Sequence, residues 1–122
     1  MTITKGATMK IQKIPPLHPG VVLYDEFLQP LKISQNQIAR DLGVSPRRIN
    51  EIIHGKRSIT ADTALRFSLY FGNSSQFWMG LQMDYDLDMA EDKSLEKLKL
   101  EVTHSIADTV KAMALGGKAA AT

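Results

Sequence analysis

Four polar side chains stand close together at positions 47–51, and their types match the hydrogen-bonding edges of nucleic-acid bases. The four residues are Arg47, Arg48, Asn50 and Glu51. An arginine can donate two parallel hydrogen bonds to guanine, an asparagine can pair with adenine in the same way, and a glutamate can accept from the amino group of cytosine. The stretch therefore has the chemistry needed to read bases in the major groove of double-stranded DNA.

The residues around this set predict two short helices joined by a tight turn. Ser34 and Ser45 are suitable N-caps because a serine hydroxyl accepts a hydrogen bond from a backbone N–H at a helix start, and Pro46 follows at a first helical position. Gly43 stands where the chain must reverse, in a left-handed conformation that glycine adopts at little cost. The buried sides come from apolar residues at helical spacing, namely Ile38, Ala39, Leu42, Ile49, Ile52 and Ile53.

This order of elements predicts a helix-turn-helix, in which the start of the second helix meets base edges in the major groove. A second group of residues is suited to phosphate because its members lie at helix starts or in the polar loop after the second helix. They are Gln35, Ser45, Lys56, Arg57 and Thr60. The alternative is an ordinary helical bundle whose surface arginines only contact water.

Composition indicates one globular domain in a reducing compartment. The chain has 122 residues, of which 43% are hydrophobic, and it has no cysteine. No apolar run approaches the roughly 20 residues that cross a bilayer, and the first residues do not resemble a signal peptide. We therefore expect a cytoplasmic protein without membrane contact. Charge is uneven, since the chain is basic up to Thr60 and purely acidic from Asp84 to Asp92, which suggests two partners, one of them polyanionic.

The pattern of apolar residues and helix-breaking residues divides the chain into four parts. A flexible arm over residues 1–16 precedes a five-helix domain over 17–88, whose first helix we expect to end at Pro30. Apolar residues at three- and four-residue steps then predict an amphipathic helical extension over 89–115, followed by a flexible tail over 116–122. Large apolar residues of the fifth helix are expected to pack in the core or against another subunit and are candidates for a dimer or partner interface, with a ligand-binding box as the alternative; they are Phe77, Trp78, Leu81 and Tyr85.

The sequence contains no arrangement typical of an enzyme. The three histidines lie far apart without metal-ligand spacing, and we find no glycine-rich phosphate loop or nucleophile elbow. The acidic run Asp84, Asp86 and Asp88 lacks the central glycine and closing glutamate of a calcium loop. We interpret it as a solvated helix end or as a contact for a basic partner. We expect no catalytic residue, no metal and no cofactor.

Three segments resemble HigA-type antitoxins, also called virulence-associated protein I, a group of xenobiotic-response-element helix-turn-helix repressors. The segments are PPLHPGVVLYDEFLQPLKISQ, GKRSITADTALRFSLYFG and FWMGLQMDYDL, and the match covers residues 16–87. The resemblance implies an all-α, lambda-repressor-like fold and a homodimer that binds operator DNA and represses its own operon. It also implies neutralisation of a partner toxin, usually a basic endoribonuclease. Many relatives have a small hydroxyl residue in place of Arg48 or Asn50, so their operator sequence does not carry over.

Two alternatives to this function stay open at this point. One is a stand-alone transcriptional regulator without a toxin, which a toxin gene beside this one would exclude. The other is a module that sequesters a toxin without reading DNA, which would bind DNA weakly and irrespective of sequence.

Overall fold

The computed structural model describes residues 15–121, with side chains as far as Leu115. The described residues form helices joined by loops, in agreement with the all-α prediction. The chain divides into two compact units after Met89. The sequence analysis placed this division one residue earlier, after residue 88. The predicted N-terminal arm lies almost entirely outside the described residues.

The first helical stretch consists of three segments, α2 (Pro19–Val22), the π-helical η1 (Leu23–Leu28) and α3 (Gln29–Leu31). The prediction that Pro30 ends this stretch is wrong, since helix continues to the next residue and ends where Lys32 turns left-handed with φ 56°. A proline ring in a regular α-helix clashes with the carbonyl four residues earlier. Here the preceding turn is wider, because the Gln29 N–H bonds to the carbonyl of Tyr24 five residues earlier, and the ring is accommodated.

The predicted helix-turn-helix consists of α4 (Gln35–Leu42) and α5 (Pro46–Ile53). Ser34 Oγ accepts a hydrogen bond from the Gln37 N–H at 3.0 Å, and Ser45 Oγ accepts one from the Arg48 N–H at 3.1 Å. Gly43, in the turn between them, has the left-handed φ of 73°. The caps and the turn predicted from the sequence are therefore confirmed.

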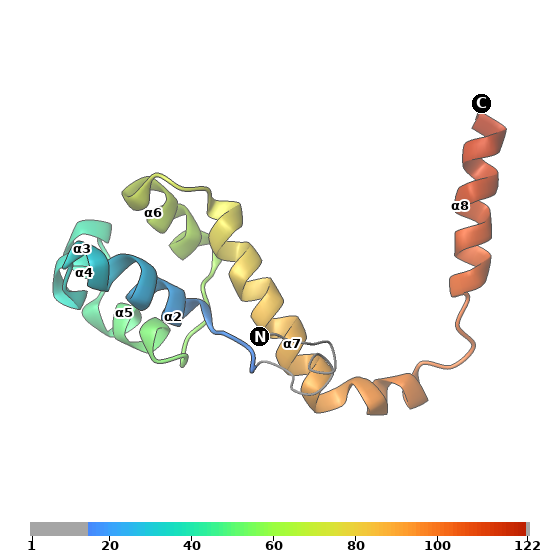
Figure 1. Cartoon of the computed structure of the whole chain (residues 1–122), viewed down its shortest axis with the longest axis horizontal. Coiled ribbons are helices and arrows are strands. Elements are labelled where there is room, and N and C mark those ends of the chain that lie inside the picture. The colour runs from blue at the N-terminus through green and yellow to red at the C-terminus, as the bar shows by residue number, and fades with distance from the viewer. Residues whose placement is uncertain (1–14, 122) are drawn as a thin grey trace, which may run out of the picture. The chain divides into compact units, whose positions relative to one another are not determined.

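Two further helices follow, α6 (Ala61–Phe71) and α7 (Ser75–Glu101) (Figure 1). They contribute most of the aromatic part of the core. Phe67 and Trp78 are fully buried with ring centroids 4.8 Å apart, and Phe27 of η1 lies 5.1 Å from Trp78. The core residues come from η1, α4, α5, α6 and α7 and from the loop before α6; they are Leu23, Leu28, Ile38, Ala39, Leu42, Ile49, Ile52, Ile59, Ala64, Phe67 and Trp78. Because these residues are buried, the orientation of α4 and α5 is fixed, and their opposite faces are turned outward.

Helix α2 packs closely against the C-terminal end of α5. A Cβ atom on Gly20 would lie 1.8 Å from the Ile52 carbonyl oxygen, so a side chain at this position cannot fit without moving a backbone. Glycine thus permits a direct backbone contact on the core side of α5, while the opposite face of that helix remains at the surface.

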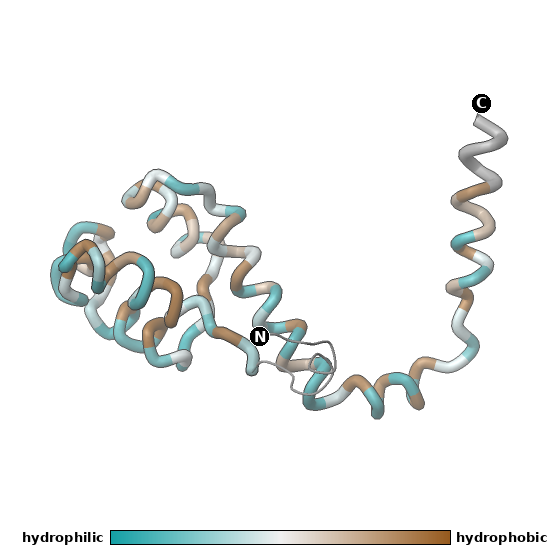
Figure 2. The backbone as a smooth tube through the Cα atoms, in the orientation of Figure 1, coloured by the Kyte–Doolittle hydropathy of each residue, from teal (hydrophilic) through white to brown (hydrophobic). Residues whose placement is uncertain are grey.

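The second unit contains the end of α7 and a separate helix, α8 (Ala107–Ala121). Hydrophobic and hydrophilic residues are interspersed along the end of α7 and along the coloured part of α8 (Figure 2), but the prediction of one continuous amphipathic helix is wrong. The helix breaks at residues 102–106, where His104 has φ 55° and Ser105 Oγ accepts a hydrogen bond from the first N–H of α8 at 3.2 Å. Serine side chains favour such caps because they bond to nearby backbone groups. Helix α8 also continues over residues 116–121, which the sequence assigned to a flexible tail.

Candidate nucleic-acid interface

Helix α5 has one buried face and one polar face. Its isoleucines face the core, whereas the Arg47 side chain is 83% exposed and Asn50 is exposed. Arg48 and Glu51 are partly covered, with side chains 30% and 23% exposed. The four residues predicted to read bases thus belong to one helix surface, but two of them are held more closely by the protein than the other two.

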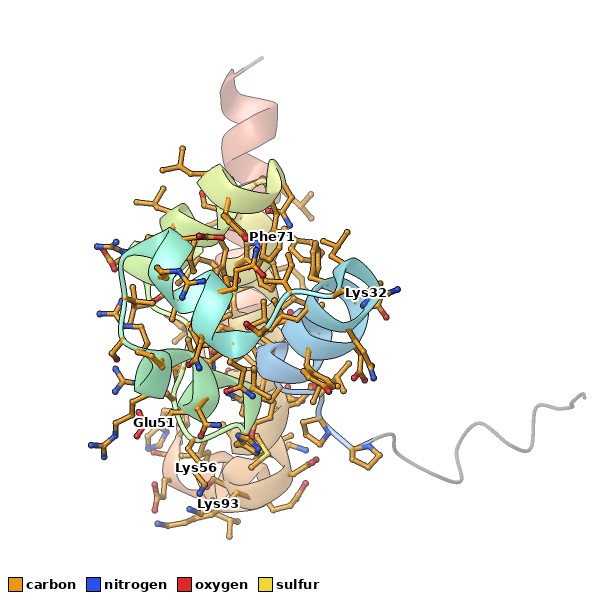
Figure 3. The ribbon with its side chains drawn as sticks, turned by 90° about the vertical axis from the view of Figure 1, so that its left-hand side faces the viewer. Lys32, Glu51, Lys56, Phe71 and Lys93 are labelled. Carbon is orange, nitrogen blue, oxygen red and sulfur yellow. The ribbon has the colours of Figure 1, made fainter. Side chains whose placement is uncertain are left out.

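Glu51 lies between two arginines. Its Oε2 atom accepts a hydrogen bond from Arg47 Nε at 2.9 Å, and its Oε1 atom accepts one from Arg57 Nε at 2.8 Å. These bonds, first the one from Arg47, hold the pKa of the Glu51 carboxyl below its ordinary value. Figure 3 shows Glu51 close to Lys56, whose backbone N–H donates to the Glu51 carbonyl at 2.8 Å. The structure therefore connects predicted base-reading residues with the basic loop predicted to bind phosphate.

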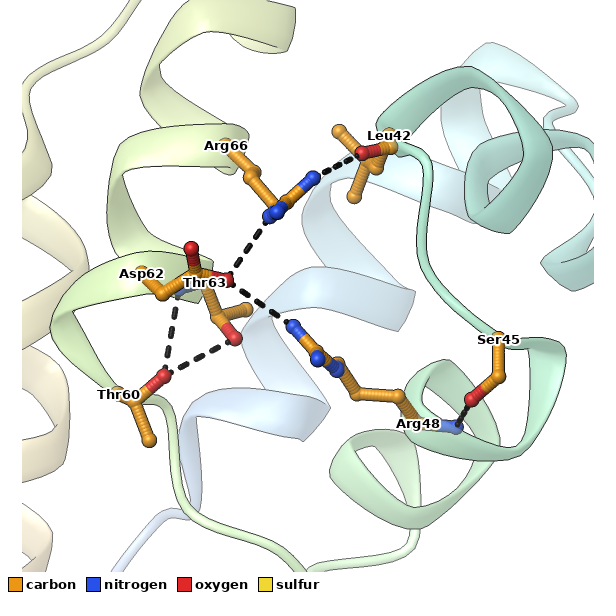
Figure 4. A network of polar contacts seen from close by, with 7 residues as sticks. All are labelled: Leu42, Ser45, Arg48, Thr60, Asp62, Thr63 and Arg66. Atoms are coloured by element: carbon orange, nitrogen blue, oxygen red, sulfur yellow. Dashed lines mark hydrogen bonds and ion pairs between the residues drawn. The ribbon is translucent and has the colours of Figure 1, made fainter.

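Arg48 is bound to α6 through a network of polar contacts (Figure 4). Its Nη1 atom donates to Asp62 Oδ2 at 3.1 Å, and the same oxygen accepts a hydrogen bond from Arg66 Nε at 2.8 Å. Arg66 Nη1 also donates to the Leu42 carbonyl at the end of α4, at 2.7 Å. The bonds from Arg66 and then Arg48 lower the pKa of Asp62. The network thus joins α4, α5 and α6.

Sequence reasoning missed Asp62 and Arg66 as neighbours of the site. Their four-residue spacing on one helix is a signal for an ion pair between the two. No comparable signal joins Asp62 to Arg48, because those residues lie on different helices, 14 positions apart.

The Asn50 and Gln35 side chains form a pair across the helix-turn-helix. Asn50 Nδ2 donates to Gln35 Oε1 at 3.1 Å, so a predicted base-reading residue contacts a predicted phosphate-binding residue in the first turn of α4. The atoms outside this bond are an acceptor, Asn50 Oδ1, and a donor, Gln35 Nε2. An acceptor beside a donor matches the N6 and N7 edge of adenine.

Two of the predicted phosphate-binding hydroxyl groups serve as helix caps. Ser45 Oγ accepts from the Arg48 N–H, as described above, and Thr60 Oγ1 accepts from the Thr63 N–H at 3.3 Å. A hydroxyl oxygen that accepts such a bond keeps its own hydrogen as a donor. Capping is therefore compatible with a hydrogen bond to a phosphate oxygen.

Both the sequence and the fold match known proteins. Residues 26–78 match the family described as Helix-turn-helix (HTH_3). Virulence-associated protein I of Dichelobacter nodosus is 51% identical over 79 residues, which span 65% of this chain and 73% of the relative. Antitoxin HigA-1 of Vibrio cholerae is 30% identical over 91 residues, which span 75% of this chain and 86% of the relative. The chain belongs to this HigA family.

The structure of another HigA-family member agrees with this assignment. The Pseudomonas aeruginosa antitoxin HigA, solved with the higBA promoter, is 42% identical and has a TM-score of 0.71, covering 73% of this chain and 97% of that one. The resemblance and the helix-turn-helix fold predicted from the sequence are therefore confirmed. Within the described residues of this chain, no helix is long and apolar enough to cross a membrane.

In this HigA-family fold, the candidate interface residues of α7 occupy different environments. Trp78 belongs to the core and not to an interface, because it is fully buried and donates its indole N–H to Asn73 Oδ1 at 3.0 Å, so it offers no surface to a partner. Leu81 is partly buried against the same core, whereas Phe77 is 41% exposed. Exposed apolar side chains of α6 and α7 provide further surface; they are Leu65, Leu69, Met79, Met83 and Leu87.

A polar cluster joins α7 to the start of α2 and to the loop after α5. His18 Nδ1 caps α2 by accepting a backbone N–H at 2.9 Å, and its ring lies edge-on to Tyr85 with centroids 4.8 Å apart. Burial lowers the pKa of His18, and the charge of Asp86 acts in the opposite direction. Gln82, buried in α7, accepts the Ile59 N–H at 2.7 Å and donates to Asp86 at 2.9 Å. Tyr85 thus supports the fold, as does Gln82, which the sequence analysis included in a family motif without assigning it a role.

The acidic run from Asp84 to Asp88 lies inside α7, which continues to Glu101. Its interpretation as a helix end is therefore wrong, since the apolar spacing on either side of the run belongs to one helix. Among the described residues, no group of three or more His, Cys, Asp or Glu side chains could hold a metal ion.

Proposed function

We propose that this protein is a DNA-binding antitoxin that represses its own operon as a homodimer and neutralises a partner toxin. The observation that carries the proposal is the outer face of α5, where exposed Arg47 and the Asn50–Gln35 pair present donors and acceptors beside a basic loop. In a helix-turn-helix, this part of the second helix meets the major groove. Membership of the HigA family supports the proposal, since a solved relative contains its promoter DNA.

In this proposal, Arg47 and Asn50 read bases, and Arg48 exchanges its ion pair with Asp62 for a base edge. Phosphate is bound by Gln35, Ser45, Lys56, Arg57 and Thr60. The two copies of α5 in the dimer lie about 34 Å apart, one turn of DNA, so the operator has two-fold symmetry. Repression results from occupancy of the promoter. There is no chemical step, so the protein is not an enzyme and needs no cofactor.

The toxin-neutralising part of the proposal rests on family membership and on charge. A basic endoribonuclease would meet complementary charge at the exposed carboxylates of α7, such as Asp84. Both proteins would act in the cytoplasm. The alternative is a regulator that uses the same DNA-binding face without a toxin.

A binding titration tests the DNA part. Full-length protein is titrated with the DNA upstream of its own gene and with scrambled DNA, at two salt concentrations. We expect the upstream DNA to be preferred by about a thousandfold or more. Arg47→Ala should cost about 1–3 kcal/mol at one base position, whereas Lys56→Ala should weaken all sequences alike and reduce the salt dependence. Equal and weak binding to both DNAs would overturn the proposal.

Co-expression tests the toxin part. The product of the adjacent gene is expressed with and without this protein, and growth and co-purification are measured. Growth arrest relieved by a complex of the two proteins is the expected result. Operator binding without any such complex would favour the stand-alone regulator, and a complex without sequence-specific DNA binding would favour the sequestering module.

A further inference from the structure

Glu51 is an acid on an otherwise basic surface. From Pro46 to Ser58 it is accompanied by two arginines of α5 and two basic residues of the following loop, and it carries the only negative side chain of that stretch. A carboxylate close to DNA phosphate is repelled by it. The charge of Glu51 alone therefore opposes DNA binding, and any favourable contribution must come from the contacts that Glu51 makes.

Each oxygen of the Glu51 carboxylate is engaged by a different arginine. Oε2 accepts from Arg47 Nε at 2.9 Å, while Oε1 is contacted by Arg57 through Nε at 2.8 Å and Nη2 at 2.7 Å. The Glu51 side chain is the most covered of the three, at 23% exposure against 83% and 44% for the arginines. The acid thus sits closer to the protein, and the guanidinium groups extend toward solvent.

The atoms used in the first of these contacts leave the end of the Arg47 guanidinium for a base. Arg47 binds Glu51 through Nε, on the side of the group, whereas its two terminal amino groups form an end edge with parallel donors. Such a pair of donors matches O6 and N7 of guanine. A long arginine side chain loses conformational freedom when it binds, and a neighbouring carboxylate that restricts it beforehand reduces this loss.

The backbone of Glu51 also holds the basic loop. The Lys56 N–H donates to the Glu51 carbonyl at 2.8 Å, and Gly55 adopts a left-handed φ of 73° in the turn between them. The main chain fixes where the loop leaves α5, and the side chain fixes Arg57 within that loop. One residue therefore orients a predicted base-reading group and a predicted phosphate-binding group at the same time.

We propose that Glu51 is a specificity-determining positioning residue: it contacts no base, and it orients Arg47 toward a base edge and Arg57 toward the DNA backbone. The inference rests on the proposed DNA-binding function and revises the role expected of Glu51 from its type alone. It predicts that loss of the Glu51 bridge reduces discrimination at the base pair that Arg47 reads.

The decisive variant is Glu51→Asp in the full chain, which keeps the charge but shortens the side chain by one methylene. Affinity is measured for the operator, for every single-base operator variant and for scrambled DNA, with helicity checked by circular dichroism. We expect scrambled-DNA affinity to remain within about twofold of wild type, while discrimination at the Arg47 base pair falls about tenfold, within the range of one bidentate base contact. Glu26→Asp, the same change at an exposed glutamate of η1, should leave the base profile unchanged.

A second variant separates charge from geometry. Glu51→Gln removes the negative charge, so scrambled DNA should bind more tightly and with a steeper salt dependence. Glu51→Gln should lose discrimination at the same base pair as Arg47→Ala. The double variant that carries Arg47→Ala and Glu51→Gln should lose little more discrimination than either single variant, because the effects of residues in contact are not additive.

Three outcomes would overturn the inference. Loss of discrimination at a base pair that Arg47→Ala does not affect would mean that Glu51 reads a base itself. An unchanged base profile in Glu51→Asp and Glu51→Gln would mean that the ion pairs are only surface contacts. Wild-type protein without operator preference would overturn the proposed function together with this inference, whereas the first two outcomes leave the proposed function intact.

Discussion

The two units of this chain are both helical, yet among the side chains that the structure describes only those of the first unit form a buried core. In the unit that ends at Met89, apolar residues such as Ile49 and Phe67 are fully buried. In the described side chains of the second unit, residues of the same kind remain exposed, including Leu100 at 80% and Val110 at 52%. The spacing of apolar residues is helical in both.

The difference teaches that helical periodicity and tertiary packing are separate properties. Periodicity requires one side chain every three or four positions, which a chain segment can satisfy by itself. Burial requires a second surface of matching shape, as α2 provides for α5 at Gly20. The following predictions test this contrast, from the largest expected effect to the smallest.

Removal of a core ring should have the largest effect. Phe67→Ala deletes a fully buried side chain whose ring centroid lies 4.8 Å from that of Trp78, and we expect a loss of about 3–5 kcal/mol in the free energy of unfolding. Leu100→Ala, in the second unit, should change it by less than about 0.5 kcal/mol. Urea unfolding measures both. A large effect of Leu100→Ala would break the contrast, because it would require a surface that covers this residue.

Two glycines within the first unit sharpen the contrast. Gly20→Ala places a Cβ atom 1.8 Å from the Ile52 carbonyl oxygen, and we expect it to destabilise the protein by about 1–3 kcal/mol through a shift of α2 against α5. Gly80→Ala meets nothing within 4 Å and should stabilise α7 by about 0.5–1 kcal/mol. Thermal unfolding of the two variants should shift in opposite directions. Equal shifts of the two unfolding temperatures would mean that the backbone contact between α2 and α5 does not exclude a side chain at Gly20.

Acidification should weaken the first unit through His18. Its pKa in the folded protein is lowered from 6.5 by burial, partly offset by Asp86, so the unfolded chain binds a proton more readily. This contribution to stability is complete above pH 6.5 and is lost as the pH falls below that value toward the lowered folded pKa. The loss should be smaller than that caused by Gly20→Ala. His18→Asn keeps an acceptor for the cap without titrating in this range, so its unfolding free energy should change less between pH 7.5 and 5.5.

Removal of α8 should have the smallest effect on stability. A chain that stops after Glu101 lacks a helix whose described side chains are all exposed. We expect the free energy of unfolding to change by less than about 0.5 kcal/mol, the operator preference to remain, and the helical circular dichroism to decrease. Reduced stability or weaker operator binding would show that α8 contacts the first unit or a second copy of the chain.

Much of the helix-turn-helix could be predicted because its signals are local. Ser34 and Ser45 accept N–H groups three residues away, and Gly43 supplies a backbone conformation that depends on its own lack of a side chain. The predicted α5 residues also occupy one helix surface. The break at His104 was not predicted, since apolar spacing continues through it.

Contacts between distant residues had no local signal. The bond from Arg48 to Asp62 depends on the packing of α6 beside α5, and the burial of Trp78 depends on rings from η1 and α6. A tryptophan can lie at the surface or in the core, and an arginine can be free at the surface or bound to a carboxylate. Residue type alone therefore could not predict the burial of Trp78 or the partner of Arg48.

The sequence by itself determined the all-helical class, the caps and turn of the helix-turn-helix, and the residue types available to read DNA, because each depends on atoms within a few positions of the chain. The tertiary structure alone decided which apolar residues form the core and that Arg48 of α5 is bound to Asp62 of α6. Burial and ion pairing depend on the distances between helix surfaces, and those distances are set only when the helices pack.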